Sequence, residues 1–189
     1  MTTASDNFNR AAESPLGPPW ISVTDLSGGA NTDGSVVTSA FGISIYAGTW
    51  GDNQWVQGIV GNLSAGTRYA ILCVRYASDG RSLGYEVHTD GVVGAGNTFI
   101  AKRIQGSVES IHVMGSSFSN GDLMRFGAVG NTLTVYKNGA EIGSVVDSAY
   151  PTGNPGVGSN ADGTIDDWLA SDGEDSVKAK RMVGWKYSR

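Results

Sequence analysis

The sequence has few charged residues and no long apolar run, and each shortage excludes a class of protein. Only 16% of the 189 residues are charged, and the formal net charge is −5. A nucleic-acid-binding protein needs a basic stripe that displaces counterions. No apolar run reaches the length of a membrane-spanning segment. We therefore expect neither nucleic-acid binding nor membrane insertion.

Cysteine is nearly absent, because Cys73 is the only one, so no disulfide forms within the chain. Cys73 lies in the apolar run Tyr69–Val74, which favours a buried thiol that packs as a small hydrophobic group. The start, residues 1–6, lacks the basic head and apolar stretch of a signal peptide. Either the chain is used without Sec export or a leader has been lost, and we expect an extracellular or virion-associated protein.

Glycine is abundant, with 28 residues, and turn residues separate short alternating segments. The clearest hairpin joins Asn131–Tyr136 to Ala140–Val146 across Lys137-Asn138-Gly139, because Asn-Gly readily takes the positive φ angles of a type I′ turn. Prolines and glycines predict a loop at Ser148–Asp162. Other strands are expected at residues 35–38, 41–46, 54–60, 67–76, 83–89, 98–104, 110–114, 123–129 and 163–170.

This pattern predicts an all-β fold, a two-sheet antiparallel β-sandwich (jelly roll), with about ten to twelve strands. No amphipathic helix of ordinary length is predicted. The sandwich is expected over residues 1–172, followed by a basic C-terminal tail, residues 173–189. The tail carries five basic and two acidic residues, a charge of +3, which leaves −8 for the remainder.

The tail combines its positive charge with large apolar side chains, which disordered segments usually lack. These apolar residues are Val177, Met182, Val183, Trp185 and Tyr187. One hypothesis is that the tail docks onto an acidic partner, either a neighbouring copy in a homo-oligomer or a virion component. The alternative is a final strand that packs on its own sandwich.

Several motifs are shared with a known superfamily. They are Asp6-Asn7-Phe8-Asn9-Arg10 with Leu16-Gly17 and Trp20, Gly121–Phe126 running into Gly130–Gly139, Asp147–Pro151, Gly153–Gly156 and Ile165–Trp168. Over about residues 6–172 the chain resembles the concanavalin A-like lectin/glucanase superfamily, in particular laminin G-like jelly-roll domains of bacterial and phage proteins. The resemblance implies a jelly roll with Trp20 and Trp168 in the core, a scaffold that carries lectins, glycosidases, lyases and adhesive domains.

Catalytic patterns of that superfamily are missing, so the sequence leans against an enzyme. Its glycosidases resemble each other in a Glu-x-Asp-x-x-Glu run, which places two carboxylates on one strand face. Here no two glutamates lie within ten residues of each other, and the neighbours Asp166 and Asp167 point to opposite faces of a strand. The Gln-x-His pair of related polysaccharide lyases is absent too, which makes a lyase the third hypothesis.

Aromatic and polar residues mark two candidate ligand sites. Trp50 and Trp55 flank a polar loop, and rings beside side-chain amides hold sugars in many proteins; the alternative is a turn with one ring packed inward. The first candidate site comprises Tyr46, Trp50, Asp52, Asn53 and Trp55. The second comprises Arg75, Tyr85, Glu86 and His88, of which Glu86 and His88 share a strand face that can also be a plain solvated surface.

Carboxylates near the two chain ends suggest a structural Ca²⁺, which jelly rolls of this type often hold. The candidate ligands are Asp6, Asp166, Asp167 and Asp172, which meet if the first and last strands pair. An Asp6–Arg10 contact with turn capping is the alternative, and no cofactor is required. The main hypothesis is a noncatalytic carbohydrate-binding or adhesion domain that binds a glycan or polysaccharide, and the runner-up is a structural virion or surface-assembly protein.

Overall fold

The computed structural model describes residues 1–24, 26, 29–38, 41–63, 69–89, 98–160 and 163–173. These ranges contain fifteen strands and no helix, so no described helix can span a membrane. The strands are β1 (Thr3–Asp6), β2 (Trp20–Ser22), β3 (Asn31–Thr32), β4 (Val37–Thr38), β5 (Phe41–Tyr46), β6 (Gln54–Gly61), β7 (Tyr69–Tyr76), β8 (Leu83–His88), β9 (Thr98–Ile104), β10 (Ser107–Met114), β11 (Leu123–Val129), β12 (Thr132–Lys137), β13 (Ala140–Val146), β14 (Asn154–Asn160) and β15 (Thr164–Ser171).

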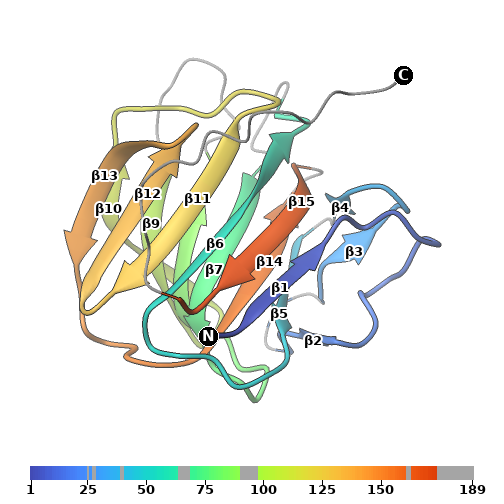
Figure 1. The fold of residues 1–189 in the computed structure, drawn as a ribbon, viewed down its shortest axis with the longest axis horizontal. Helices are drawn as coiled ribbons and strands as arrows, with labels where there is room; N and C mark the ends of the chain where they lie inside the picture. Colours follow the sequence, from blue (N-terminus) through green and yellow to red (C-terminus); the bar gives the residue numbers. More distant parts are fainter. Residues whose placement is uncertain are drawn as a thin grey trace.

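The strands form two antiparallel sheets packed face to face, which confirms the predicted jelly-roll sandwich (Figure 1). The first sheet runs β13-β12-β11-β6-β15-β4-β3, with β1 also paired to β15. The second sheet runs β10-β9-β8-β7-β14-β5-β2. Alternate residues of both sheets point into the space between them. The core includes Val56, Phe126 and Leu133 from the first sheet and Leu72, Val87 and Ile100 from the second, all fully buried.

The first and last strands pair, and this pairing adds β1 to the first sheet. Thr3 lies opposite Ser171 and Asp6 opposite Trp168. The pairing strand ends just before Phe8, which follows it in a turn with φ 54°. Trp20 and Trp168 are 4% and 1% exposed, so both belong to the core, as the resemblance implies.

The predicted β12–β13 hairpin is present, and Asn138 and Gly139 have φ angles of 52° and 84°. The loop predicted at Ser148–Asp162 is wrong in its second half, because β14 lies there in the middle of the second sheet. Glycine is required at positions 156 and 158 of this central strand because the backbone of β5 lies very close to them. A Cβ on either would lie 2.7 Å or less from a backbone oxygen of β5.

The strands that the sequence did not predict are β14 and the short strands β1, β2 and β3, whose two to four residues carry no readable alternation, and they raise the total above the ten to twelve predicted. The basic tail falls almost wholly in residues 174–189, outside the described residues. Its docking, oligomer and virion roles remain predictions.

Candidate functional site

A bulge in β7 places Arg75 at one end of the sandwich. Arg75 has a φ of 53°, and the pairing with β14 shifts register at this point. Cys73 and Tyr76 both pack in the apolar cluster on the outer face of the second sheet, although strict alternation would put them on opposite faces. A β-bulge commonly re-aims a side chain in this way. The Arg75 side chain therefore leaves the sheet and enters the loops.

The Arg75 guanidinium holds three loops through their backbone carbonyls. Its Nε donates to Asp52 O at 2.8 Å, its Nη2 to Gly130 O at 2.6 Å and its Nη1 to Tyr150 O at 3.4 Å. These acceptors belong to the β5–β6, β11–β12 and β13–β14 connections. Although Arg75 is only 2% exposed, it forms no ion pair within the described part of the chain. Burial lowers its pKa, and the charges of Tyr85 and Asp52 offset this only in part.

A pocket of about 290 Å³ opens beside Arg75, and we call it the loop-end pocket. Its walls come from the β7–β8 and β13–β14 connections, which lie at the lower end of the sandwich in Figure 1, near the N-terminus. The lining residues are Arg75, Ala77, Ser78, Asp79, Arg81, Leu83, Tyr150, Pro151, Thr152 and Gly153. Gly153 lets the two loops meet, because a Cβ there would lie 2.3 Å from Tyr76 O.

Tyr150 is a fixed ring in the pocket wall. Its hydroxyl donates to Arg103 O at 2.9 Å, and its backbone N donates to Tyr85 Oη at 3.0 Å. The Tyr85 ring meets the Tyr150 ring edge to face, with centroids 5.2 Å apart. Tyr85 itself donates to Asp147 Oδ1 at 2.6 Å, and burial together with this bond raises the Tyr85 pKa to about 12. The aromatic wall is thus held in place before any ligand arrives.

The first set of predicted ligand residues is split between different surfaces. Tyr46 stacks on Trp168 at 5.4 Å, and Trp50 meets Tyr46 edge to face, so both pack on the core. Trp55 instead lies on the outer face of the first sheet, where Arg125 stacks over its ring at 4.0 Å. Trp50 and Trp55 therefore do not form one platform.

Two other predicted residues do lie at the loop end. Asp52 is exposed, and its carbonyl binds Arg75. Asn53 Oδ1 accepts a hydrogen bond from Gly130 N at 2.9 Å and links the same loops. These two residues lie outside the described lining, and they support Arg75, which is part of it.

Glu86 and His88 do share the outer face of the second sheet, but that face is not solvated, which corrects the alternative of a plain polar surface. Glu86 is fully buried and His88 is 4% exposed. The Glu86 carboxylate accepts hydrogen bonds from Arg103 Nε and Nη2, at 2.6 and 2.8 Å, and contacts His88 and the Tyr76 hydroxyl. Burial would raise the Glu86 pKa, yet the bonds from His88 and Arg103 outweigh it and lower the pKa to about 2.

Apolar groups surround this ion cluster, including Cys73, which is buried as predicted. Burial raises the pKa of the Cys73 thiol well above its ordinary value. Tyr85, the fourth residue of the second predicted site, points into the sandwich core instead. Glu86 and His88, two of the candidate groups of the lyase hypothesis, are engaged with each other and with Arg103.

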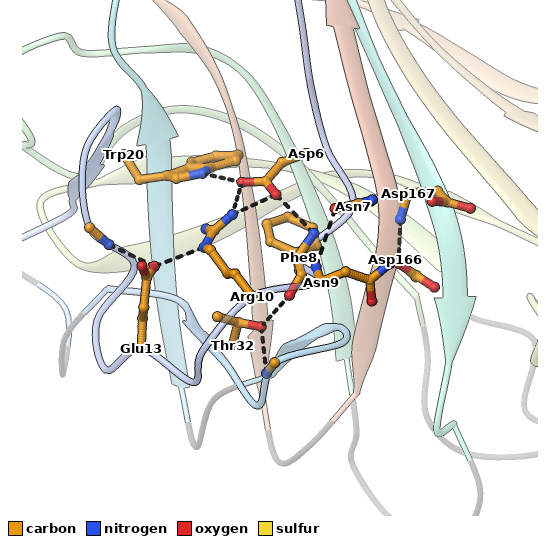
Figure 2. A network of polar contacts seen from close by, with 12 residues as sticks. Asp6, Asn7, Phe8, Asn9, Arg10, Glu13, Trp20, Thr32, Asp166 and Asp167 are labelled. Carbon is orange, nitrogen blue, oxygen red and sulfur yellow. Dashed lines mark hydrogen bonds and ion pairs between the residues drawn. The ribbon is translucent and has the colours of Figure 1, made fainter.

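The predicted calcium ligands do not come together in the structure. Asp6 faces Arg10 and Trp20, accepting from Arg10 Nη1 at 2.7 Å and Trp20 Nε1 at 2.8 Å (Figure 2). Asp172 lies at the other end of the β1–β15 pair, where it accepts from Gly51 N at 2.9 Å. Among the described residues no group of three or more His, Cys, Asp or Glu side chains is arranged to hold a metal ion. The Asp6–Arg10 contact that was the alternative is present.

The chain is similar in fold to proteins of known structure, although its sequence matches no known family. No family model matches the chain, and no curated protein matches its sequence. Solved structures do match. The carbohydrate-binding module CBM66 from Bacillus subtilis is 14% identical, with a TM-score of 0.57 over 86% of this chain and 93% of the module. A prokaryotic β-1,3-1,4-glucanase (lichenase) from a mouse hindgut metagenome is 11% identical, with a TM-score of 0.63 over 91% and 99%.

A third match is the Caenorhabditis elegans galectin LEC-6, which is 14% identical, with a TM-score of 0.53 over 68% of this chain and 89% of the galectin. The chain has the concanavalin A-like jelly-roll fold. At these identities the likeness concerns the fold alone.

The sequence pattern did not indicate several residues of the loop-end pocket. Tyr150 and Thr152 lie in a segment read only as a loop, and Asp79 and Arg81 lie in a turn. One feature of the sequence could have indicated Tyr150: it is a large aromatic residue in a loop rich in proline and glycine. Binding residues concentrate on loops that a rigid scaffold holds in place.

Proposed function

We propose that the chain is a noncatalytic saccharide-binding domain and that its ligand site is the loop-end pocket. The observation that carries this proposal is that Tyr150, which is held in place by two hydrogen bonds, lines an open pocket together with hydroxyl and charged residues. Aromatic rings pack on the apolar CH faces of sugars, while polar groups bind the hydroxyls.

The size and rigidity of the pocket support the same function. A volume of about 290 Å³ is at the lower end of the range for small-molecule sites. It suits a single sugar ring with its substituents better than a long stretch of polymer. Because Tyr85 and Arg103 already hold Tyr150, a ligand that binds against it causes little further loss of conformational entropy.

The solved structures of similar fold support a saccharide as ligand. One is a carbohydrate-binding module, and another, the Emp47p carbohydrate recognition domain, is 11% identical with a TM-score of 0.58 over 90% of this chain and 95% of that domain. The outer face of the second sheet is a weaker candidate, because Glu86, Arg103 and His88 bind one another there and are buried.

The test is a glycan array with the full chain, followed by calorimetry on the glycans that bind. Tyr150→Ala should abolish binding while the strand-type circular dichroism remains, and Tyr150→Phe should retain most of the affinity. The matched control is Tyr136→Ala, because Tyr136 lies in β12 on the first sheet, outside the pocket lining. Full binding by Tyr150→Ala, or no glycan bound by the wild type, would show the proposal to be wrong.

A further inference from the structure

The charge of the loop-end pocket is the opposite of the charge of the chain. Its lining carries Arg75, Arg81 and Asp79, a net charge of +1, in a chain of formal charge −5. Arg81 Nε and Asp79 Oδ2 form an ion pair at 2.7 Å, with side chains 61% and 53% exposed. Such an exposed pair is weak and separates readily. The unbalanced charge therefore belongs to Arg75.

Arg75 also keeps donor capacity beyond the loops that it holds. A guanidinium has five N–H groups, and three of them meet the carbonyls of Asp52, Gly130 and Tyr150. The other two have no acceptor within the described ranges. Burial lowers the pKa of Arg75, and the charges of Tyr85 and Asp52 offset this only in part, so the compensation of its positive charge is incomplete. An anion in the pocket would supply it.

We propose that the ligand of the loop-end pocket is a saccharide that carries a carboxylate, as a uronic acid does, and that Arg75 and Arg81 bind this carboxylate. The proposal rests on the saccharide-binding function above. A guanidinium matches a carboxylate with two parallel hydrogen bonds, which are charge-assisted. Arg75 lies at the pocket wall with a fixed orientation, whereas Arg81, on the exposed rim, can exchange Asp79 for the ligand.

The first arm of the experiment compares saccharides that differ only in charge. An array carries uronate-containing oligosaccharides beside their carboxyl-reduced counterparts, in which CH₂OH replaces COO⁻, and calorimetry with the full chain gives the affinities. The acidic member of a bound pair should bind at least tenfold tighter, and this preference should fall as salt is added. Equal or tighter binding of the reduced member would overturn the inference and leave the proposed function standing. Binding of no member would overturn the inference, and the proposed function would fall as well only if the wild type also bound nothing on the general glycan array.

The second arm uses a variant that should gain affinity, which misfolding cannot mimic. Asp79→Asn removes the one carboxylate of the described lining but keeps an oxygen for the Arg81 backbone N. It should bind the acidic saccharide several-fold tighter and the reduced one as before, and Arg81→Gln should bind the acidic one several-fold more weakly. Glu141→Gln is the control, since Glu141 is exposed on β13 and changes the net charge equally. Equal effects of Asp79→Asn and Glu141→Gln would overturn the inference.

Discussion

Arg75 and Arg103 are almost equally buried, at 2% and 1% exposure, yet they lie in opposite electrostatic surroundings. Arg103 binds the Glu86 carboxylate with two hydrogen bonds in the middle of the second sheet. Arg75 binds only carbonyls at the loop end. Burial lowers the pKa of both, but Glu86 outweighs this effect at Arg103 and raises its pKa, whereas the pKa of Arg75 stays lowered.

The difference separates a structural arginine from a binding arginine. A buried cation that already has its carboxylate has nothing to gain from a ligand, and removing either partner leaves an isolated buried charge. A buried cation held by carbonyls keeps its net charge available. We therefore assign Arg103 to the stability of the sheet and Arg75 to the loop-end pocket, and each assignment can be tested by unfolding.

The largest effect is expected on removing the carboxylate of the Glu86–Arg103 pair. Glu86→Gln removes the carboxylate that accepts two hydrogen bonds from the buried Arg103, which should lower the free energy of unfolding by roughly 3–5 kcal/mol, measured by urea denaturation. The double variant Glu86→Leu with Arg103→Met should be more stable than Glu86→Gln, because it removes both charges. If Glu86→Gln were as stable as the wild type, the assignment of Arg103 to the stability of the sheet would be wrong.

Acid should weaken the same pair. The Glu86 pKa is about 2 in the folded protein against an ordinary value of 4.5, so the folded state binds this proton less readily. The corresponding stability is fully present above the unfolded pKa and is lost as the pH falls from about 4.5 to about 2, by about 3 kcal/mol. Urea midpoints measured across this range should fall more steeply for the wild type than for Glu86→Gln. Parallel slopes would contradict the assignment.

A smaller loss is expected at Arg75. Arg75→Met removes three hydrogen bonds to carbonyls beside an open pocket, where water can replace the lost donors. The free energy of unfolding should fall by about 1–2 kcal/mol, less than for Glu86→Gln, while affinity for an acidic saccharide should be lost. Thermal melting and calorimetry on the same sample separate the two effects. A loss as large as that of Glu86→Gln would make Arg75 a structural residue as well.

The smallest effect concerns a third arginine, Arg125, which stacks on Trp55 on the outer face of the first sheet. A cation over a ring at a partly exposed site contributes about 0.5–1 kcal/mol, so Trp55→Leu should lower the free energy of unfolding by about that amount. Saccharide binding should be unchanged, since Trp55 lies outside the described lining of the loop-end pocket. Weakened binding would restore Trp55 to the ligand site.

Local patterns in the sequence predicted the parts of the fold that local chemistry determines. The Asn138-Gly139 turn fixes its hairpin by its own φ angles, and alternation placed Glu86 and His88 on one face. The same reasoning failed at β14, where Gly156 and Gly158 are required by the closeness of β5, a strand more than a hundred residues away in the sequence.

The candidate site was harder to predict than the fold, for two physical reasons. Burial of Glu86 depends on what covers the sheet, which alternation does not reveal. The position of Arg75 depends on a bulge, and one unpaired residue reverses the facing of those that follow. The sequence did identify Arg75, Asp52 and Asn53 as candidates, but Tyr150, the aromatic residue of the pocket lining, comes from a loop with no periodic signal.

Because one guanidinium binds the carbonyls of three loops, a loop that opens breaks its own bond to Arg75 and loosens the side chain that holds the other two loops. Segments coupled in this way exchange their amide hydrogens as a cooperative unit. The backbone N–H of Arg75, which donates to Gln54 Oε1 at 2.8 Å, belongs to the same unit. A ligand seated against any one wall of the pocket would therefore slow exchange in all three loops, including those that it never touches.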